Sequence, residues 1–251
     1  MRAPDIVVTP ASPDALRPLR EAYRRELACQ IIKDAWHARG FTTPWLLHLD
    51  GAVAGYGTTG GSRGEPHDTL MEFYLVPAAR VEGRRLFAAL LAASRPAWIE
   101  AQTNDPFLHP RVYDTGQAWT APTILFSDQH TTRLPAPGVT LHRLTEADRA
   151  AAFPHTTEPV GEWGLEREGR IVATGGLFHH YNPPYGDLYM EVDPGFRGRG
   201  YASWLVQELK RICREGGRVP AARCDAGNAA SRGALERAGM LPCGRVLRSR
   251  I

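Results

Sequence analysis

The sequence predicts an α/β protein of the α+β type, made of two similar units that each contain a mixed, mostly antiparallel sheet flanked by helices. An internal repeat, two hairpin patterns and regular glycine and proline positions support this prediction. In the repeat, Met71–Pro77 resembles Leu188–Pro194. Both segments have the pattern of a strand and stop at a proline, which cannot continue a central ladder. The repeat therefore predicts two copies of one structural unit along the chain.

The residues around the repeat also match. The offset between the two prolines is 194 − 77 = 117, and it aligns Arg80 with Arg197 and Gly83 with Gly200. Hairpins are expected across residues 50–51 and 168–169, where a polar residue and a glycine separate two alternating runs. The remaining patterns predict strands at 6–9, 43–49, 52–59, 98–103, 139–143, 163–167, 171–178 and 221–226, and helices at 86–93, at 201–213 and before Gly116 and Gly239.

Domain boundaries follow from the repeat. We expect a first unit over 1–128, a linker over 129–138 that contains Pro135 and Pro137, and a second unit over 139–251. From opening strand to proline the first unit takes 77 − 6 = 71 residues and the second 194 − 139 = 55. The second unit is therefore expected to lack a helix before its hairpin, and a unit this short is marginally stable alone.

Composition and charge narrow the function classes. Apolar residues make up 43% and charged residues 23% of the 251 residues, as in ordinary globular proteins. No stretch approaches the roughly 20 apolar residues of a membrane span, and the first residues lack the apolar core of a signal peptide, so cytoplasmic residence is expected. The net charge of +3 does not require a nucleic-acid partner. The four cysteines form no CxxC pair, and no metal site is expected.

The most informative segment runs from Glu191 to Val206. A strand ends at Pro194, a turn with glycines at 195, 198 and 200 follows, and a helix begins near Tyr201. Such a turn can direct several backbone N–H groups at one point, where the helix dipole, Arg197 and Arg199 add positive charge. The arrangement suits a pyrophosphate; a plain glycine-rich turn with solvated arginines is the alternative. The pattern matches neither a P-loop nor GxGxxG.

Two motifs in this half resemble those of the GNAT superfamily of acetyltransferases. The segment Val192-x-Pro194-x-x-Arg197-Gly198-Arg199-Gly200-Tyr201-Ala202 is similar to the family's acetyl-CoA-binding motif, Gln/Arg-x-x-Gly-x-Gly/Ala. Downstream, Asn228-x-x-Ser231 followed by Gly239-Met240 is similar to the family's second motif, with Met240 where Phe is usual. The order and spacing of the two motifs make the resemblance fairly specific, and it is clearest over residues 165–247.

The resemblance implies an acetyl-CoA site without a metal. Backbone amides after Arg197 would hold the pyrophosphate, and the strand ending at Val192 would pair with the pantetheine arm. The Val192 N–H would polarise the thioester carbonyl, as an oxyanion hole does. Asn228 would bind the pantetheine arm with Ser231 nearby; the alternatives are a helix N-cap for Asn228 and a plain surface position for Ser231. The expected acetyl-CoA-binding residues are Val192, Arg197, Gly198, Arg199, Gly200, Tyr201, Ala202, Ser203, Asn228 and Ser231.

The groups that move protons are harder to assign. Many family members carry a Tyr on the last helix that protonates the leaving thiolate, but the matching position here is Leu235. An amine must lose a proton before it attacks a thioester, and a carboxylate or His usually assists. Strand alternation places Asp187, Tyr189 and Glu191 on one face of the strand. That face either borders the site of the amine acceptor or is exposed to solvent. These three are the candidate catalytic residues; a buried core position is the alternative for Tyr189.

The first unit is expected to be a degenerate copy that does not bind CoA. Its loop has Val81 where the second unit has Gly198, which blocks backbone approach, and Glu82 where the second has Arg199. A carboxylate facing a pyrophosphate is repulsive. Asp105 falls at the position that corresponds to Asn228.

These observations favour an N-acetyltransferase that moves an acetyl group from acetyl-CoA to a primary amine by direct attack. The expected acceptor is a small molecule. A catalytically silent CoA-binding sensor or scaffold module is the alternative, and a protein- or RNA-directed modifier is a third. The sequence does not specify the oligomeric state.

Overall fold

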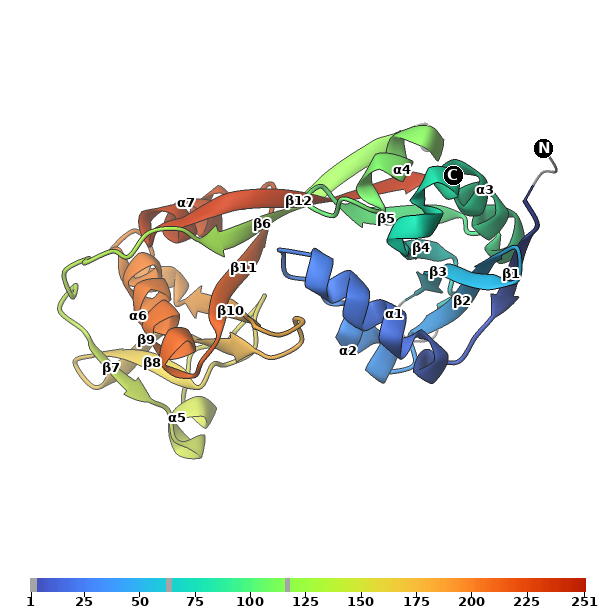
Figure 1. Cartoon of the computed structure of the whole chain (residues 1–251). Helices are drawn as coiled ribbons and strands as arrows, with labels where there is room; N and C mark the ends of the chain where they lie inside the picture. Colours follow the sequence, from blue (N-terminus) through green and yellow to red (C-terminus); the bar gives the residue numbers. More distant parts are fainter. Residues whose placement is uncertain (1–3, 62–64, 116–117) are drawn as a thin grey trace. The chain divides into compact units, whose positions relative to one another are not determined.

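The computed structural model describes residues 4–61, 65–115 and 118–251, so Gly116, the expected end of one helix, lies outside the described residues. Helices and strands are mixed along the chain, which confirms the predicted fold class. The chain divides into two compact units, one formed by Met1–Ala121 with Arg245–Ile251 and the other by Pro122–Gly244 (Figure 1).

The first unit is built on a mixed sheet. Its elements are β1 (Ile6–Pro10), α1 (Pro13–Glu26), α2 (Lys33–Ala38), β2 (Thr42–Leu49), β3 (Ala52–Gly60), β4 (Thr69–Leu75), a 3-10 helix η1 (Pro77–Glu82), α3 (Gly83–Ser94), β5 (Trp98–Gln102) and α4 (His109–Thr115). The strand order is β1-β2-β3-β4-β5-β12, where β12 (Met240–Arg250) comes from the end of the chain. β4 and β5 are parallel and the other neighbours antiparallel.

The second unit repeats this plan with fewer helices. Its elements are β6 (Trp119–Asp128), β7 (Thr140–Arg143), α5 (Glu146–Ala150), β8 (Trp163–Arg167), β9 (Arg170–Phe178), β10 (Tyr185–Val192), a 3-10 helix η2 (Pro194–Phe196), α6 (Tyr201–Glu215), β11 (Val219–Asp225), α7 (Ala229–Arg237) and the start of β12. The strand order is β6-β11-β10-β9-β8-β7, with β10 and β11 parallel and the other neighbours antiparallel. Before its hairpin this unit has only the five-residue α5, where the first unit has α1 and α2.

Local backbone geometry explains the two hairpins. Asp50 and Gly51 have φ of 50° and 80°, and Glu168 and Gly169 have φ of 52° and 76°. Positive φ at both central residues defines the type I′ turn, whose twist matches that of the flanking strands. Both predicted hairpins are therefore present.

A shared hydrogen bond supports the internal repeat. Arg80 Nε donates to Leu75 O at 3.1 Å, and Arg197 Nε donates to Val192 O at 3.4 Å. Each arginine thus reaches back five residues to the end of the strand before it. The two halves share this turn although their loop sequences differ.

The last strands of the two halves exchange partners. β6, which follows α4, pairs with β11 from Ala221↔Ser127 to Asp225↔Thr123. β12, which follows α7, pairs with β5 from Val246↔Gln102 to Arg250↔Trp98. The boundaries between the units therefore fall inside β6 and β12, which differs from the boundaries expected at 128 and 139. Residues 129–138, the expected linker, contain no helix or strand and belong to the second unit by their contacts.

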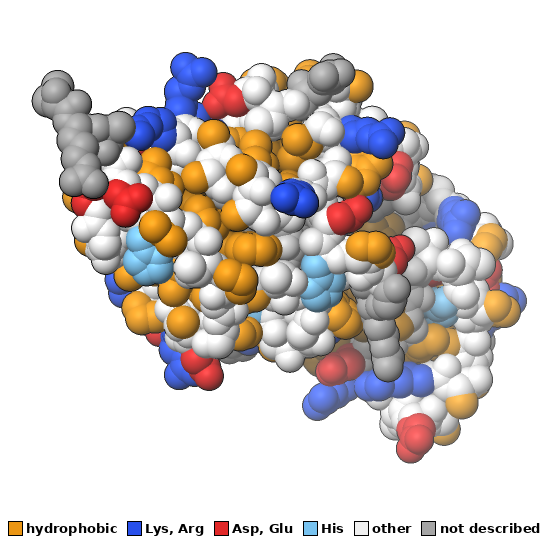
Figure 2. Space-filling view, turned by 90° about the vertical axis from the view of Figure 1, so that its right-hand side faces the viewer, with side chains coloured by type: hydrophobic (Ala, Val, Ile, Leu, Met, Phe, Trp, Pro, Cys, Tyr) orange, Lys and Arg blue, Asp and Glu red, His pale blue; other side chains and the backbone are white. Residues whose placement is uncertain are grey.

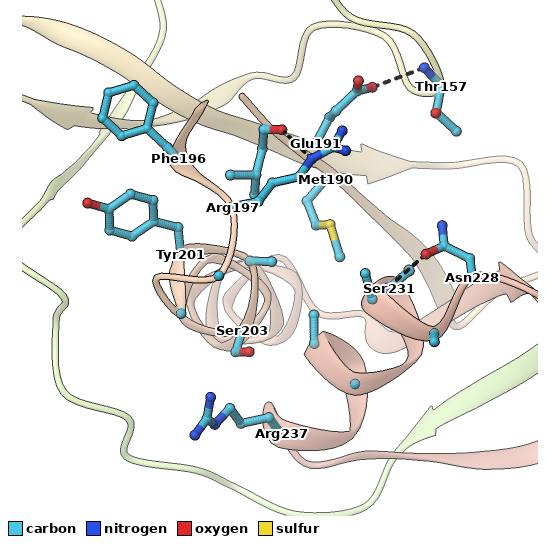
Figure 3. Close-up of a pocket in the computed structure, with 18 of the residues that line it drawn as sticks. Thr157, Met190, Glu191, Phe196, Arg197, Tyr201, Ser203, Asn228, Ser231 and Arg237 are labelled. Atoms are coloured by element: carbon cyan, nitrogen blue, oxygen red, sulfur yellow. Dashed lines mark hydrogen bonds between the residues drawn. The ribbon is translucent and has the colours of Figure 1, made fainter. Parts of the chain in front are cut away.

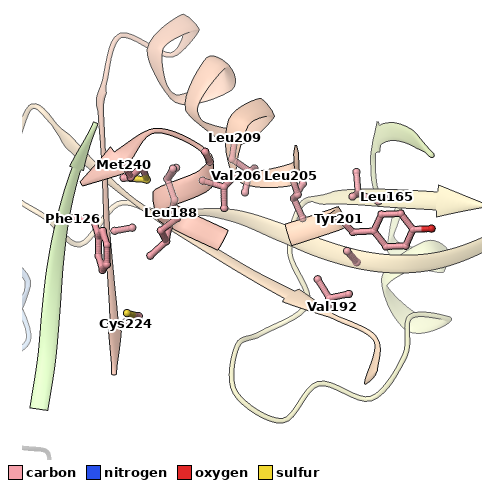
Figure 4. Close-up of a cluster of buried hydrophobic side chains, with 14 of the residues drawn as sticks. Phe126, Leu165, Leu188, Val192, Tyr201, Leu205, Val206, Leu209, Cys224 and Met240 are labelled. Carbon is pink, nitrogen blue, oxygen red and sulfur yellow. The ribbon is translucent and has the colours of Figure 1, made fainter. Parts of the chain in front are cut away.

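One face of α6 holds the loop that precedes it against the core of the second unit (Figure 4). Apolar side chains recur along one helical face. These buried positions, each at most 2% exposed, are Tyr201, Leu205, Val206, Leu209 and Cys213. They pack with Leu188 and Val192 of β10. Burial of each large side chain stabilises the unit by about 1.5–3 kcal/mol, so the start of α6 is fixed relative to the end of β10.

The surface carries both signs of charge. On the face shown in Figure 2, acidic and basic side chains are interspersed. Among the described residues, no helix combines the length and the apolar character needed to cross a membrane.

Candidate functional site

A pocket of about 730 Å³ lies in the second unit, where the end of β10 meets the starts of α6 and α7 (Figure 3). Its volume is within the range of small-molecule sites, about 300–1,000 Å³. All the residues expected to bind acetyl-CoA line it, with the exception of Arg199. In the described part of the chain, no group of three or more His, Cys, Asp or Glu side chains is arranged to hold a metal ion.

One wall of the pocket is an open edge of β10. This strand pairs with β11 only from Tyr185↔Val219 to Leu188↔Ala222, so within the described parts of the chain no strand pairs with its last residues on that side. Asp193 N donates to Val172 O of β9 at 3.0 Å. Successive backbone groups of a strand point to opposite edges, so the N–H of Val192 points to the open edge. An extended ligand could pair with this edge as an added strand does.

The start of α6 presents uncapped backbone N–H groups. Its N-cap is Gly200, with φ of 81° and no side-chain cap hydrogen bond. Gly198 has φ of 76°, and a Cβ at either glycine would meet no atom within 4 Å. The backbone conformation, rather than crowding, therefore favours glycine at both positions. The first N–H groups of the helix have no acceptor within the helix and carry its positive dipole end, which suits an anion.

The arginines of this region have different roles. Arg197 lines the pocket, and its Nε is held by Val192 O. The guanidinium of Arg199 lies over the ring of Phe196 at 5.2 Å and does not line the pocket. Arg237 of α7 lines the pocket near Ser203 (Figure 3). Arg237 was not identified from the sequence, although it follows Ala230, Gly233 and Ala234 at the spacing of one helical face.

The start of α7 forms the opposite wall. Asn228 Oδ1 accepts a hydrogen bond from Ser231 N at 3.0 Å, which makes Asn228 the N-cap of α7. Both residues line the pocket (Figure 3). The cap uses only the oxygen of the Asn228 amide, so the expected alternative for this residue, an N-cap, is compatible with a second role for its NH₂ group.

Glu191 is committed to holding a loop. Its Oε1 accepts hydrogen bonds from Thr156 N at 3.0 Å and Thr156 Oγ1 at 3.1 Å, and its Oε2 from Thr157 N at 3.1 Å and Glu158 N at 2.9 Å. Burial acts to raise the pKa of Glu191, but these donors outweigh it and lower the pKa below 4.5. The carboxylate lies at the pocket, 7% exposed, and its contacts make it a weak proton acceptor.

The other two catalytic candidates lie outside the pocket lining. Asp187 is 2% exposed, and its Oδ2 bonds His180 Nε2 at 2.8 Å and pairs with Arg223 Nε at 3.4 Å. Tyr189 stacks on Phe178 with 4.1 Å between ring centroids, and burial raises the pKa of its hydroxyl. Asp187 and Glu191 are both buried, so the face that they share is not simply solvent-exposed.

Glu158 lines the pocket and was not identified from the sequence. It lies in the irregular segment between α5 and β8, next to Thr157, whose N–H is also held by Glu191. Burial raises the pKa of Glu158 above 4.5, and the negative charge of Asp187 raises it further, while Arg223 acts in the opposite direction. In the sequence, Glu158 is one acidic residue in a segment without helical or strand periodicity, so no pattern marks it as a site residue.

In the first unit, Arg80 and Asp105, at the positions that correspond to Arg197 and Asn228, contact other residues of that unit. Arg80 Nη2 pairs with Glu26 at 2.6 Å, and its guanidinium lies over the ring of Phe107 at 5.1 Å. Asp105 accepts hydrogen bonds from Phe107 N at 2.8 Å and from Tyr23 OH at 2.9 Å. In the first unit, the residues at the positions of Arg197 and of the α7 N-cap, Asn228, are therefore bonded to their own neighbours.

Comparisons with known proteins agree with this geometry. Residues 125–240 match the model of the acetyltransferase (GNAT) family. An acetyltransferase from the GNAT family of Colwellia psychrerythraea has a TM-score of 0.77 at 16% identity, with 98% of this chain and 99% of that chain covered. A tandem GNAT protein from the clavulanic acid biosynthesis pathway has a TM-score of 0.62 at 13% identity, with 97% of each chain covered.

A third similar structure is a GCN5-related N-acetyltransferase from Sphaerobacter thermophilus, with a TM-score of 0.56 at 18% identity and coverage of 98% of this chain and 95% of that chain. The search of curated proteins finds no match. At these identities the structural likeness establishes the fold, and the family model covers the segment that contains the pocket. Residues 125–240 match the acetyltransferase (GNAT) family model, and over nearly its whole length the chain has the fold of these GNAT structures, a tandem GNAT protein among them.

Proposed function

We propose that this protein transfers an acetyl group from acetyl-CoA to a primary amine of a small molecule, by direct attack of the amine on the thioester. The observation that supports the proposal most is that the open edge of β10 and the uncapped start of α6 line one pocket. An open strand edge suits the amide-rich pantetheine arm, and an uncapped helix start suits a pyrophosphate.

The residues of the pocket fit this ligand. The pyrophosphate would be held by backbone N–H groups from Gly198 to Ser203, with Arg197 and Arg237 adding positive charge at the same pocket. When bound, acetyl-CoA supplies an electrophilic thioester carbonyl. The N–H of Val192 would donate to the oxygen of that carbonyl as negative charge develops on it. The NH₂ group of Asn228 would bind the pantetheine arm.

The three acid–base candidates receive other roles in this proposal. Glu191 would order the loop at residues 156–158 through its four hydrogen bonds. Asp187 would orient His180, and Tyr189 would stack on Phe178. Each of these residues would therefore act through its neighbours rather than on the reacting atoms.

A CoA-binding module without turnover is the second candidate. It is favoured by Leu235, which is 1% exposed in the core and occupies the position where many family members have a Tyr. A leucine cannot protonate the leaving thiolate. In the acetyl-transfer proposal, water would supply that proton.

Two measurements separate these functions. Isothermal titration calorimetry with acetyl-CoA tests binding, and thiol release across a panel of primary amines tests turnover. We expect both in the wild type, and loss of binding in the Arg197→Ala, Gly200→Glu double variant. Arg211→Ala on the exposed face of α6 is the matched control. Tight binding by the double variant would refute the site, and binding without thiol release from any amine would favour the silent module.

A further inference from the structure

The loop at residues 156–158 is held so that one side of it lines the pocket. Three successive backbone N–H groups and the Thr156 hydroxyl donate to the Glu191 carboxylate. Glu191 is the neighbour of Val192, whose N–H faces the open edge of β10. This bonding fixes the backbone of Glu158 beside the end of β10 while its own carboxylate takes no part in it.

The electrostatic surroundings of Glu158 favour a carboxylate that exchanges protons. The side chain is half-buried and lines the pocket. Burial is the largest cause of its raised pKa; Asp187 and Glu191 raise the pKa further, while Arg223 and His180 lower it. Carboxylates that serve as general bases are commonly shifted upwards in this way, towards the working pH.

The other acids and bases of this region are already engaged. Glu191 accepts hydrogen bonds on both oxygens, which lowers its pKa. Asp187 does not line the pocket and bonds His180 Nε2. Among the described residues that line the pocket, Glu191 and Glu158 are the carboxylates. Of these two pocket carboxylates, Glu158 is therefore the one that does not hold the loop.

We infer that Glu158 binds the ammonium group of the acceptor and removes its proton, as the general base of the proposed transfer. The inference rests on the proposed function and names a cationic amine as the substrate class. An ammonium R–NH₃⁺ gives one proton to the Glu158 carboxylate, which passes it to water. The amine nitrogen then forms a C–N bond to the acetyl carbon while the C–S bond breaks. The second proton leaves that nitrogen to water, and water protonates the thiolate sulfur, so the products are the amide and free CoA.

Glu158→Gln tests this role while keeping the backbone N–H that Glu191 holds. With an amine that the wild type acetylates, we expect kcat/KM for the amine to fall about 100-fold near pH 7. The deficit should shrink as the pH approaches the amine's own pKa, about 10, because the free amine then needs no base. The dissociation constant for acetyl-CoA should stay within about twofold of wild type, a change of about 0.4 kcal/mol.

Two further variants make the test specific. Glu158→Asp keeps a carboxylate and should show an intermediate rate with the wild-type pH profile. Glu146→Gln, an exposed acid of α5 that does not line the pocket, should behave as wild type. A Glu158→Gln deficit that is the same at every pH, or a rate equal to wild type, would overturn the assignment.

A measurement without acetyl-CoA gives an independent readout. Carboxyl ¹³C NMR of the free protein, with the Glu158 resonance identified by its loss in Glu158→Gln, should show a midpoint above 4.5. A midpoint at or below that value would count against the role. If the wild type binds no acetyl-CoA or releases no thiol, the proposed function fails, and the base role fails with it. If the wild type turns over normally and Glu158→Gln does too, the base role fails alone.

Discussion

Replacement of Glu191 by Gln should destabilise the second unit, because one carboxylate accepts four hydrogen bonds from the loop at residues 156–158. A Gln side chain keeps one carbonyl oxygen and presents an NH₂ group to the donors on the other side. Two of the four hydrogen bonds therefore lose their acceptor. Hydrogen bonds to a charged group contribute about 1.5–3 kcal/mol each. Two of them at the low end of that range give a loss of about 3 kcal/mol.

The low end applies because the loop itself lies near the surface, with Thr156 and Thr157 exposed, so water can replace part of the lost bonding. The pH dependence has a definite sign. The folded pKa of Glu191 is lowered from 4.5, so its stabilisation is fully present above the unfolded pKa and is lost as the pH falls through the folded pKa. The difference between wild type and Glu191→Gln should therefore be largest near neutral pH and shrink in acid.

Urea denaturation followed by tryptophan fluorescence, at pH 7 and again below pH 4.5, measures both effects. Glu166→Gln is the matched control, because Glu166 is a strand glutamate of the same unit whose side chain is 41% exposed. Its free energy of unfolding should change by less than about 0.5 kcal/mol. A Glu191→Gln variant as stable as wild type at pH 7, or one whose deficit does not change with pH, would refute the argument that this carboxylate anchors the loop.

Other variants test the pocket and the fold. Arg237→Ala should weaken acetyl-CoA binding about 5- to 10-fold, and the effect should be smaller at high salt. Arg199→Ala should change the affinity less than about twofold, because the Arg199 guanidinium lies over Phe196. Equal losses of affinity in the two variants, measured by calorimetry, would contradict this difference. Lys210→Met should cost about 3 kcal/mol in urea denaturation, because the buried ammonium pairs with the buried Asp128 at 2.8 Å and donates to two backbone carbonyls at 2.6 and 2.7 Å; a loss under about 1 kcal/mol would argue otherwise. A fragment of residues 139–251 lacks β6, the partner of β11, and should melt without cooperativity in calorimetry; a sharp two-state transition would show that β6 is dispensable.

Local signals were sufficient for most of the helices, strands and turns. Alternation ending at Pro77 and Pro194 predicted β4 and β10, and the predicted strands and helices agree with the observed bounds within a few residues. The glycines at 198 and 200 have the positive φ that the loop requires. Such features depend on a residue and its near neighbours, so the sequence is enough to predict them.

Contacts between distant residues were not predictable in the same way. The sequence pattern did not predict β6 and β12, because these strands pair with β11 and β5, which are far away in the sequence. Arg199 was expected at the ligand, but its side chain packs on Phe196. Side-chain direction on a turn depends on local packing partners, which periodicity does not contain.

The sequence by itself determined the two-unit α/β architecture, the position of the glycine-rich turn after β10 and the resemblance to acetyltransferases, since each depends on residue type and short spacing. Tertiary structure alone decided which strand completes each sheet, that Glu191 holds a loop, and that Glu158 lines the pocket. The physical reason is that these features depend on which distant groups become neighbours when the chain folds. Burial and the charges of those neighbours then set the chemistry of each side chain.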